Sequence, residues 1–147
     1  MAVTVEKLGS TIFVDHDVYT GATSSAAVAW RDMRDFRNLL VTICPASLAG
    51  TGVTAFSIKA APAASATNAQ TIVSHAVGSA PDAVGDILVL ECSAEQIAQI
   101  GAAAGYELRY VGVYLTVNNS SDINVVTWIF GGARNPQTGL TDDIVSS

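Results

Sequence analysis

The interpretation of the whole chain starts from residues 106–130. They read Tyr-Glu-Leu-Arg-Tyr-Val-Gly-Val-Tyr-Leu-Thr-Val, then Asn-Asn-Ser-Ser-Asp, then Ile-Asn-Val-Val-Thr-Trp-Ile-Phe. Two runs rich in β-branched and aromatic residues flank a short polar break, which is the pattern of a β-hairpin. A strand with one solvated face alternates apolar and polar residues more strictly than either run does. We therefore expect both faces of this hairpin to be covered, one by a second sheet and the other by a loop or another subunit.

The rest of the chain repeats this strand character in shorter runs. Apolar runs at residues 36–44, 53–60, 70–77 and 86–92 are separated by turns rich in Gly, Pro and Ser, and Pro45 is expected to end the first of them. Ser93 and Gln96 match a capping box and Gly105 a helix end, which predicts an α-helix at Ala94–Ala104. We predict an all-β fold, a jelly-roll-like β-sandwich with one short helix. It forms a single domain over residues 1–147, with flexible arms at residues 1–10 and 137–147.

The composition excludes several classes of partner. Half of the 147 residues are apolar, 14% are charged and the net charge is −6. The seven Lys and Arg are scattered, so nucleic acid is not expected as a ligand. No apolar run approaches the roughly 20 residues of a membrane span, and the first residues lack the pattern of a signal peptide. We therefore expect synthesis in the cytosol, where Cys44 and Cys92 remain unpaired thiols.

Two short clusters carry titratable side chains. Asp15-His16-Asp17 places two carboxylates beside an imidazole, but neighbours on a strand point to opposite faces, so we interpret the cluster as an exposed polar turn without a metal. Arg31, Arg34 and Arg37 form the one cluster of cations, in a segment interpreted as a strand end and turn. It is either a solvated loop with weak ion pairs or a loop that docks on a partner.

Catalytic motifs are missing from the sequence. There is no Gly-rich phosphate loop, no Cys-x-x-Cys, no His-Glu-x-x-His and no Gly-x-Ser-x-Gly elbow. His16 and His75 are the two histidines, and His75 lies on a predicted strand, where a structural role is the common one. We expect no enzyme and no cofactor. A small hydrolase would need a pocket that holds His16 or His75 beside a carboxylate.

The second half of the chain resembles a group of small virion proteins of tailed bacteriophages. The shared pattern is Gly105-Tyr106, then Arg109-Tyr110-Val111, the polar break, the second apolar run, and an exit from Gly131 through Arg134 to Pro136. In the first half, Asp-Met-Arg-Asp-Phe-Arg-Asn-Leu at residues 32–39 and Thr-x-Phe-x-Ile at residues 54–58 fit the same group.

The resemblance implies a head decoration, or cement, protein with no catalytic residues. Such a protein would lie on the capsid surface of the virion, bind the major capsid protein and itself, commonly as a homotrimer, and need neither nucleic acid nor membrane. We expect capsid contacts from the segment that carries Arg31, Arg34 and Arg37, and from the two arms. For Tyr110, Tyr114 and Trp128 we expect packing in the core or between subunits.

Other functions fit the same pattern of residues. A receptor- or carbohydrate-binding β-sandwich of a tail fibre would show exposed aromatic residues in a groove, for which Trp30 is the best candidate. A minor structural protein of the neck or tail is a further alternative. The number of copies per virion, hundreds or a handful, separates that alternative from a cement protein.

Overall fold

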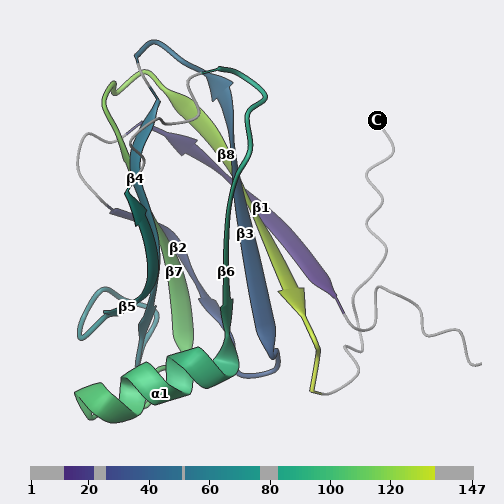
Figure 1. The fold of residues 1–147 in the computed structure, drawn as a ribbon, viewed down its shortest axis with the longest axis vertical. Helices are drawn as coiled ribbons and strands as arrows, with labels where there is room; N and C mark the ends of the chain where they lie inside the picture. The colour runs from purple at the N-terminus through teal and green to yellow at the C-terminus, as the bar shows by residue number, and fades with distance from the viewer. Residues whose placement is uncertain (1–11, 22–25, 51, 77–82, 135–147) are drawn as a thin grey trace, which may run out of the picture.

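A computed structural model describes residues 12–21, 26–50, 52–76 and 83–134, and these fold into a sandwich of two antiparallel sheets (Figure 1). The first sheet has the order β1-β8-β3-β6 and the second has the order β2-β7-β4-β5. The strands are β1 (Phe13–Thr20), β2 (Ala26–Asp32), β3 (Asn38–Ser47), β4 (Val53–Ala61), β5 (Gln70–Ala76), β6 (Leu88–Ser93), β7 (Tyr110–Val117) and β8 (Ile123–Gly131). The helix α1 (Ala94–Ala104) lies across one end, which we call the basal end (Figure 1).

The strand order is that of a jelly roll. Strand β1 pairs with β8, β2 with β7, β3 with β6 and β4 with β5, always antiparallel. The chain therefore behaves like one long hairpin that is wrapped around the sandwich, with its two ends in β1 and β8. The prediction of an all-β, jelly-roll-like sandwich with one short helix is confirmed.

The hairpin predicted for residues 106–130 is wrong. Strand β7 pairs with β2 and β4, whereas β8 pairs with β1 and β3, so the two runs lie in opposite sheets. The polar break between them is an arch that crosses from one sheet to the other, at the end opposite α1 (Figure 1). A short polar break between two strands has the same composition in a hairpin and in an arch, so the sequence pattern does not distinguish them.

Two local predictions also need correction. Asp15-His16-Asp17 is not a turn, because it lies in the middle of β1. Pro45 does not end its strand either: β3 continues to Ser47, with an irregular register between Pro45 and Ser47. Proline is tolerated at such an irregularity, since the ladder there does not need its missing N–H group.

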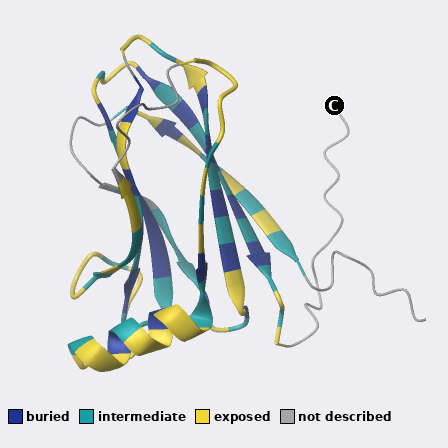
Figure 2. Cartoon of the chain, in the orientation of Figure 1, coloured by how far each residue is buried: buried dark blue, intermediate teal, exposed yellow. Residues whose placement is uncertain are grey.

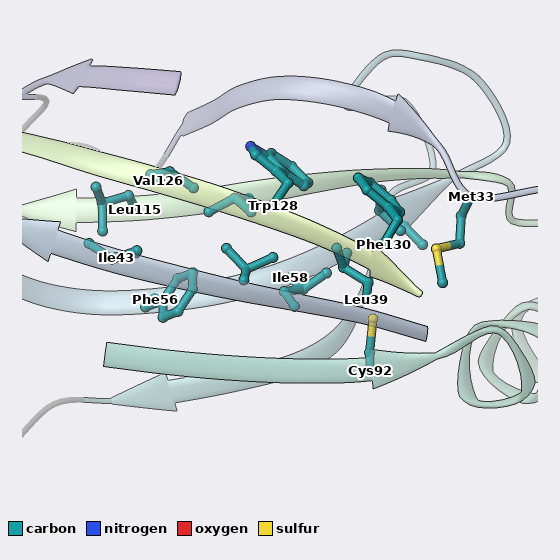
Figure 3. Packing of buried hydrophobic residues seen from close by; sticks show 14 of the residues in the cluster. Met33, Leu39, Ile43, Phe56, Ile58, Cys92, Leu115, Val126, Trp128 and Phe130 are labelled. Atoms are coloured by element: carbon teal, nitrogen blue, oxygen red, sulfur yellow. The ribbon is translucent and has the colours of Figure 1, made fainter. Parts of the chain in front are cut away.

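The core lies between the two sheets and is built by strict alternation. Val111, Val113, Leu115 and Val117 of β7 are almost fully buried, and they face the buried Val126, Trp128 and Phe130 of β8. Figure 3 shows Trp128, Phe130 and Phe56 among aliphatic side chains from both sheets. Both runs are thus strands with one face in the core, although they do not pair with each other.

Helix α1 matches its predicted bounds. Ser93 accepts from the N–H of Gln96, and the Gln96 side chain accepts from the N–H of Ser93, which is the expected capping box. Gly105 ends the helix with a positive φ of 78°. A Cβ atom at position 101 would lie 2.6 Å from the carbonyl oxygen of Tyr106. Only glycine at this position therefore lets the segment after the helix pack this closely against it.

Candidate functional site

Arg31 joins the two sheets at their open edge, where β1 and β2 are the edge strands. Its Nε and Nη2 donate to Asp15 Oδ2 at 3.0 and 2.7 Å. Its Nη1 lies 2.8 Å from Asp17 Oδ2, and the guanidinium covers the Trp128 ring at 4.4 Å. Trp128 Nε1 donates to the same Asp17 oxygen at 2.8 Å. This cluster spans the gap between the sheets, and inward-pointing charge is one way in which a sandwich protects its edge strands.

The charges in this cluster alter the titration of Asp15. Burial raises the pKa of its carboxyl, but the hydrogen bond from Arg31, the N–H of His16 and the nearby positive charges together lower it. Burial tends to lower the pKa of Arg31, and the two carboxylates more than restore it, so its pKa is raised. Arg31 therefore stays charged and paired with Asp15 and Asp17 of its own chain, with 15% of its side chain exposed.

Arg34 and Arg37, the other two cations of the predicted cluster, are exposed at the basal end. Arg34 is 3.8 Å from Asp32, a pair with 60% of the Arg34 side chain exposed. Arg37 has no ion pair within the described part of the chain. The segment after β2 is a turn, as predicted, and it places these two arginines beside α1.

The fold gathers cations that are far apart in the sequence. Arg109 donates from Nε to Asp32 Oδ2 at 2.9 Å and also from Nη2 to the same oxygen. The backbone N–H of Arg134 donates to the Asp35 carbonyl at 2.8 Å. Arg34, Arg37, Arg109 and Arg134 thus surround the basal end, although the sequence contains only seven lysines and arginines. The scattered distribution inferred from the sequence does not hold in space.

These arginines border a groove of about 630 Å³, which we call the basal groove. One wall is α1, with Ala94, Ala98 and Ala102 at successive turns, and the other carries Tyr106 and Leu108. Arg34, Arg109 and Arg134 line it together with one acidic residue, Glu107. A smaller hollow that contains Arg37 and Glu95 adjoins the groove at Ala94 and Arg134. The basal groove is apolar at its floor and mainly basic at its rim.

The aromatic residues singled out in the sequence differ in position. Trp128 is fully buried in the core, and Tyr114 is 8% exposed on the outer side of β7. Trp30 packs over Gly112 and meets Tyr114 edge-on at 6.0 Å, while Lys59 Nζ lies 4.2 Å from the centre of the Tyr114 ring. The outer face of β7 is therefore covered by side chains of neighbouring strands in the same sheet, and not by a loop or another subunit as expected. Tyr110 is half-buried beneath Arg109, whose guanidinium is 5.0 Å from its ring.

Trp30 lies in none of the three hollows described for this chain, including one beside β3 and β6. Its ring is instead used to cover Gly112, and half-buried packing of this kind leaves little open ring face for a sugar. No observation at Trp30 thus favours the carbohydrate-binding alternative.

The outer side of the β1-β8-β3-β6 sheet carries apolar residues on either side of a polar row formed by His16, Thr127 and Thr42. Its outward positions include Val14 and Val18, which are 58% and 61% exposed, and Val89, which is 48% exposed. Leu40, Val125 and Ile129 lie between them and are half-buried. We call these six residues the apolar sheet face. Figure 2 shows alternating exposed and partly buried bands along β1. The exposed positions include Val14 and Val18, and the partly buried ones between them are Asp15 and Asp17.

The histidines and cysteines are separated from one another. His16 lies on the outer side of β1 and His75 on β5, and both are exposed. Cys44 and Cys92 are free, as predicted: Cys44 faces outward next to Val125, whereas Cys92 is buried on the inward side, opposite Leu39. Side chains on opposite sides of a sheet cannot form a disulfide. Burial raises the pKa of the Cys92 thiol to about 12.

Within the described ranges, no three His, Cys, Asp or Glu residues come close enough to hold a metal ion. Nor is any helix in those ranges long and apolar enough to cross a membrane. The two predicted arms, residues 1–10 and 137–147, lie outside the described residues.

Two features were missed from the sequence, and each had a partial signal. In β1 the aspartates at 15 and 17 alternate with Val14, His16 and Val18, which would have placed the two valines on one face if this segment had been interpreted as a strand. The basal groove had no local signal, because Arg34, Arg109 and Arg134 meet only through the fold.

Comparisons with known proteins do not assign a family. No protein-family model and no curated protein sequence matches the chain. One similar solved structure comes from a study of Bacillus endospore appendages, described as a family of disulfide-linked pili; it is 11% identical, with a TM-score of 0.44 over 90% of this chain and all of that one. Another is the SPBc2 prophage-derived protein YomS, 16% identical, with a TM-score of 0.42 over 88% of this chain and all of that one. Both scores are low, so the fold assignment rests on the strand order of this chain.

Proposed function

We propose that this chain is a structural protein of a tailed-phage virion, which binds the outside of the head and stabilises it by bridging major capsid subunits. The observation that supports this function best is the apolar sheet face. Val14 and Val18 are more than half exposed on an edge strand, and Leu40, Val125 and Ile129 continue the surface inward. Apolar residues that gather on one side of a sheet are typical of a surface that is buried on assembly, although His16, Thr127 and Thr42 form a polar row across the middle of this one.

The outer side of this sheet is large enough for a principal contact. Four strands at the usual spacing of about 4.8 Å, each with about eight residues at about 3.3 Å, give a flat area of roughly 500 Å². A standard protein interface buries about 800 Å² on each partner. The whole outer side of this sheet, of which the apolar sheet face is a part, would therefore supply more than half of such an interface, and the exposed Arg34 and Arg37 are proposed to add polar contacts.

The charge distribution suits burial of this face. Among the outward-pointing described residues of the sheet, the ionisable ones are His16, Glu91 and the Cys44 thiol. An interface over the six apolar residues would thus leave few charges without water or a partner, which is the usual cost of burying a charged surface. The net charge of −6 would keep the free protein soluble before it docks.

The resemblance to phage virion proteins adds support, because the pattern residues from the first half of the chain contact those from the second half. Asp32 pairs with Arg109, the Asp35 carbonyl accepts from the N–H of Arg134, and Arg37 donates to Gly131. The pattern residues therefore belong to one structural unit at the basal end. A homotrimer remains part of the proposal, since decoration proteins at threefold positions of a shell match its symmetry.

The test is binding to heads of the source phage that lack this protein. Val14→Lys combined with Val18→Lys should weaken co-sedimentation with heads at least tenfold, because two lysines would have to be buried against the shell. Thr71→Lys combined with Ser74→Lys is the matched control, as both residues are exposed on β5, the edge strand of the other sheet. Equal binding by both double variants would refute docking through this face.

A second measurement addresses the alternatives within the virion. Quantitative mass spectrometry of purified particles should find hundreds of copies per virion. A handful of copies would instead indicate a neck or minor tail protein, and intact protein that binds no heads would refute the cement function itself.

A further inference from the structure

We propose that residues 137–147 bind back onto the basal groove of their own chain in the free protein. This inference does not depend on head binding. It concerns the end of the molecule that carries α1, and it assigns a resident occupant to a groove that is otherwise open.

The groove is suited to a short peptide that is both apolar and acidic. Ala94, Ala98 and Ala102 present a low, apolar helix wall, which lets another backbone approach closely, and Tyr106 is 39% exposed opposite it. Arg134 has no ion pair within the described ranges, and Arg34 is only loosely held by Asp32. Glu107 is the one acidic lining residue, and Asp32 is engaged with Arg109.

The segment has the complementary composition. Residues 137–147 read Gln-Thr-Gly-Leu-Thr-Asp-Asp-Ile-Val-Ser-Ser. Asp142 and Asp143 supply negative charge without any lysine or arginine, and Leu140, Ile144 and Val145 supply apolar side chains. Carboxylates near exposed guanidinium groups form charge-assisted hydrogen bonds, which match the rim of the groove.

The position of Arg134 makes the chain's own segment the favoured occupant. Arg134 lines the groove and its N–H donates to the Asp35 carbonyl, so the last described residue before the segment lies at the groove. The helix wall from Ala94 to Ala102 is roughly 12 Å long, and eight residues from Arg134 to Asp142 reach up to about 26 Å when extended. The linker is long enough to turn back, and Gly139 permits the turn. A tether this short gives an effective concentration on the order of millimolar, well above that of another copy in solution.

The experiment uses full-length chains and a fluorescent peptide with the sequence of residues 137–147. The wild-type chain should bind the peptide at least tenfold more weakly than a chain with Asp142→Asn and Asp143→Asn, because the wild-type groove is already occupied. Adding Arg134→Gln to that double variant should abolish peptide binding. Lys59→Gln is the matched control, since it removes a cation from the outer side of the other sheet, and it should leave peptide binding unchanged.

Each other outcome would overturn the proposal. Equal binding to the wild-type chain and the double variant would show that the groove is not occupied by its own segment. Absence of binding to both would show that the groove does not recognise this sequence, and insensitivity to Arg134→Gln would place the peptide elsewhere. Concentration-dependent association of the wild-type chain, lost on Asp142→Asn and Asp143→Asn, would show that a second copy supplies the segment. None of these results bears on whether the apolar sheet face binds heads.

Discussion

Arg31 is the residue whose replacement we expect to weaken the open edge of the sandwich most. Arg31→Met keeps much of the apolar stem but leaves Asp15 and Asp17 side by side on the inner side of β1 without a cation. Since the cluster is only partly exposed, we expect a loss of about 1–3 kcal/mol in the free energy of unfolding. Urea unfolding measures it, with Arg37→Met as the control, which should change stability by less than about 0.5 kcal/mol. Equal effects of the two variants would contradict a stabilising role for the cluster.

Asp32 and Asp15 give the fold a dependence on acid. The hydrogen bond from Arg109 is the largest influence that lowers the pKa of Asp32 below its usual 3.8, and burial opposes it. A carboxyl whose pKa is lowered by folding stabilises the fold above the unfolded pKa, and this stabilisation is lost as pH falls through the folded value. We expect the free energy of unfolding to be level at neutral pH and to decline from about pH 5 downward.

Asp32→Asn checks this dependence. The variant should be less stable than wild type at pH 7 and should lose less further stability on acidification, because it has one fewer carboxylate to protonate. Urea unfolding between pH 7 and pH 3 measures both slopes. Parallel curves for wild type and Asp32→Asn would show that this carboxyl does not contribute to the acid response.

At the scale of elements, the arch between β7 and β8 is held by Asp122. This side chain is fully buried, and its Oδ1 accepts from the N–H groups of Ala49 and Gly50 at 2.7 and 3.1 Å. Asp122→Ala should cost about 2–3 kcal/mol, because two backbone donors lose a charged acceptor. Asp122→Asn keeps one acceptor oxygen and should cost less. Unfolding of the alanine variant within about 0.5 kcal/mol of wild type would mean that the arch does not need this anchor.

The elements also show what the sequence could predict. Helix α1 was predicted to the residue, because its capping box and Gly105 are local signals of where a helix begins and ends. Most strands were located by their apolar runs, but which strands pair depends on contacts between residues far apart in the chain. The connection after β7 was therefore predicted as a hairpin, and residues 15–17 were interpreted as a turn because Asp15 and Asp17 look like turn residues until Arg31 is placed opposite them.

For the molecule as a whole, neither candidate surface could be predicted from the sequence, because each is formed by residues that are far apart in the chain. The apolar sheet face needs β1, β8, β3 and β6 side by side, an order that no single run of residues determines. The basal groove needs Arg34, Arg109 and Arg134 to meet at α1. Composition locates neither surface, although half of the residues are apolar and 14% are charged.

The most direct test of the proposed docking face is the reactivity of Cys44. This thiol is partly exposed beside Val125 and in line with Val18, whereas Cys92 is buried with its pKa raised to about 12 and should stay unreactive. Alkylation of the free protein should therefore modify Cys44 alone, and saturating bare heads should slow that modification at least tenfold. A thiol introduced by Ser74→Cys on the outer side of the other sheet should stay as reactive as before. Cys44 that reacts at the same rate in protein shown to be bound to heads would contradict docking through the apolar sheet face.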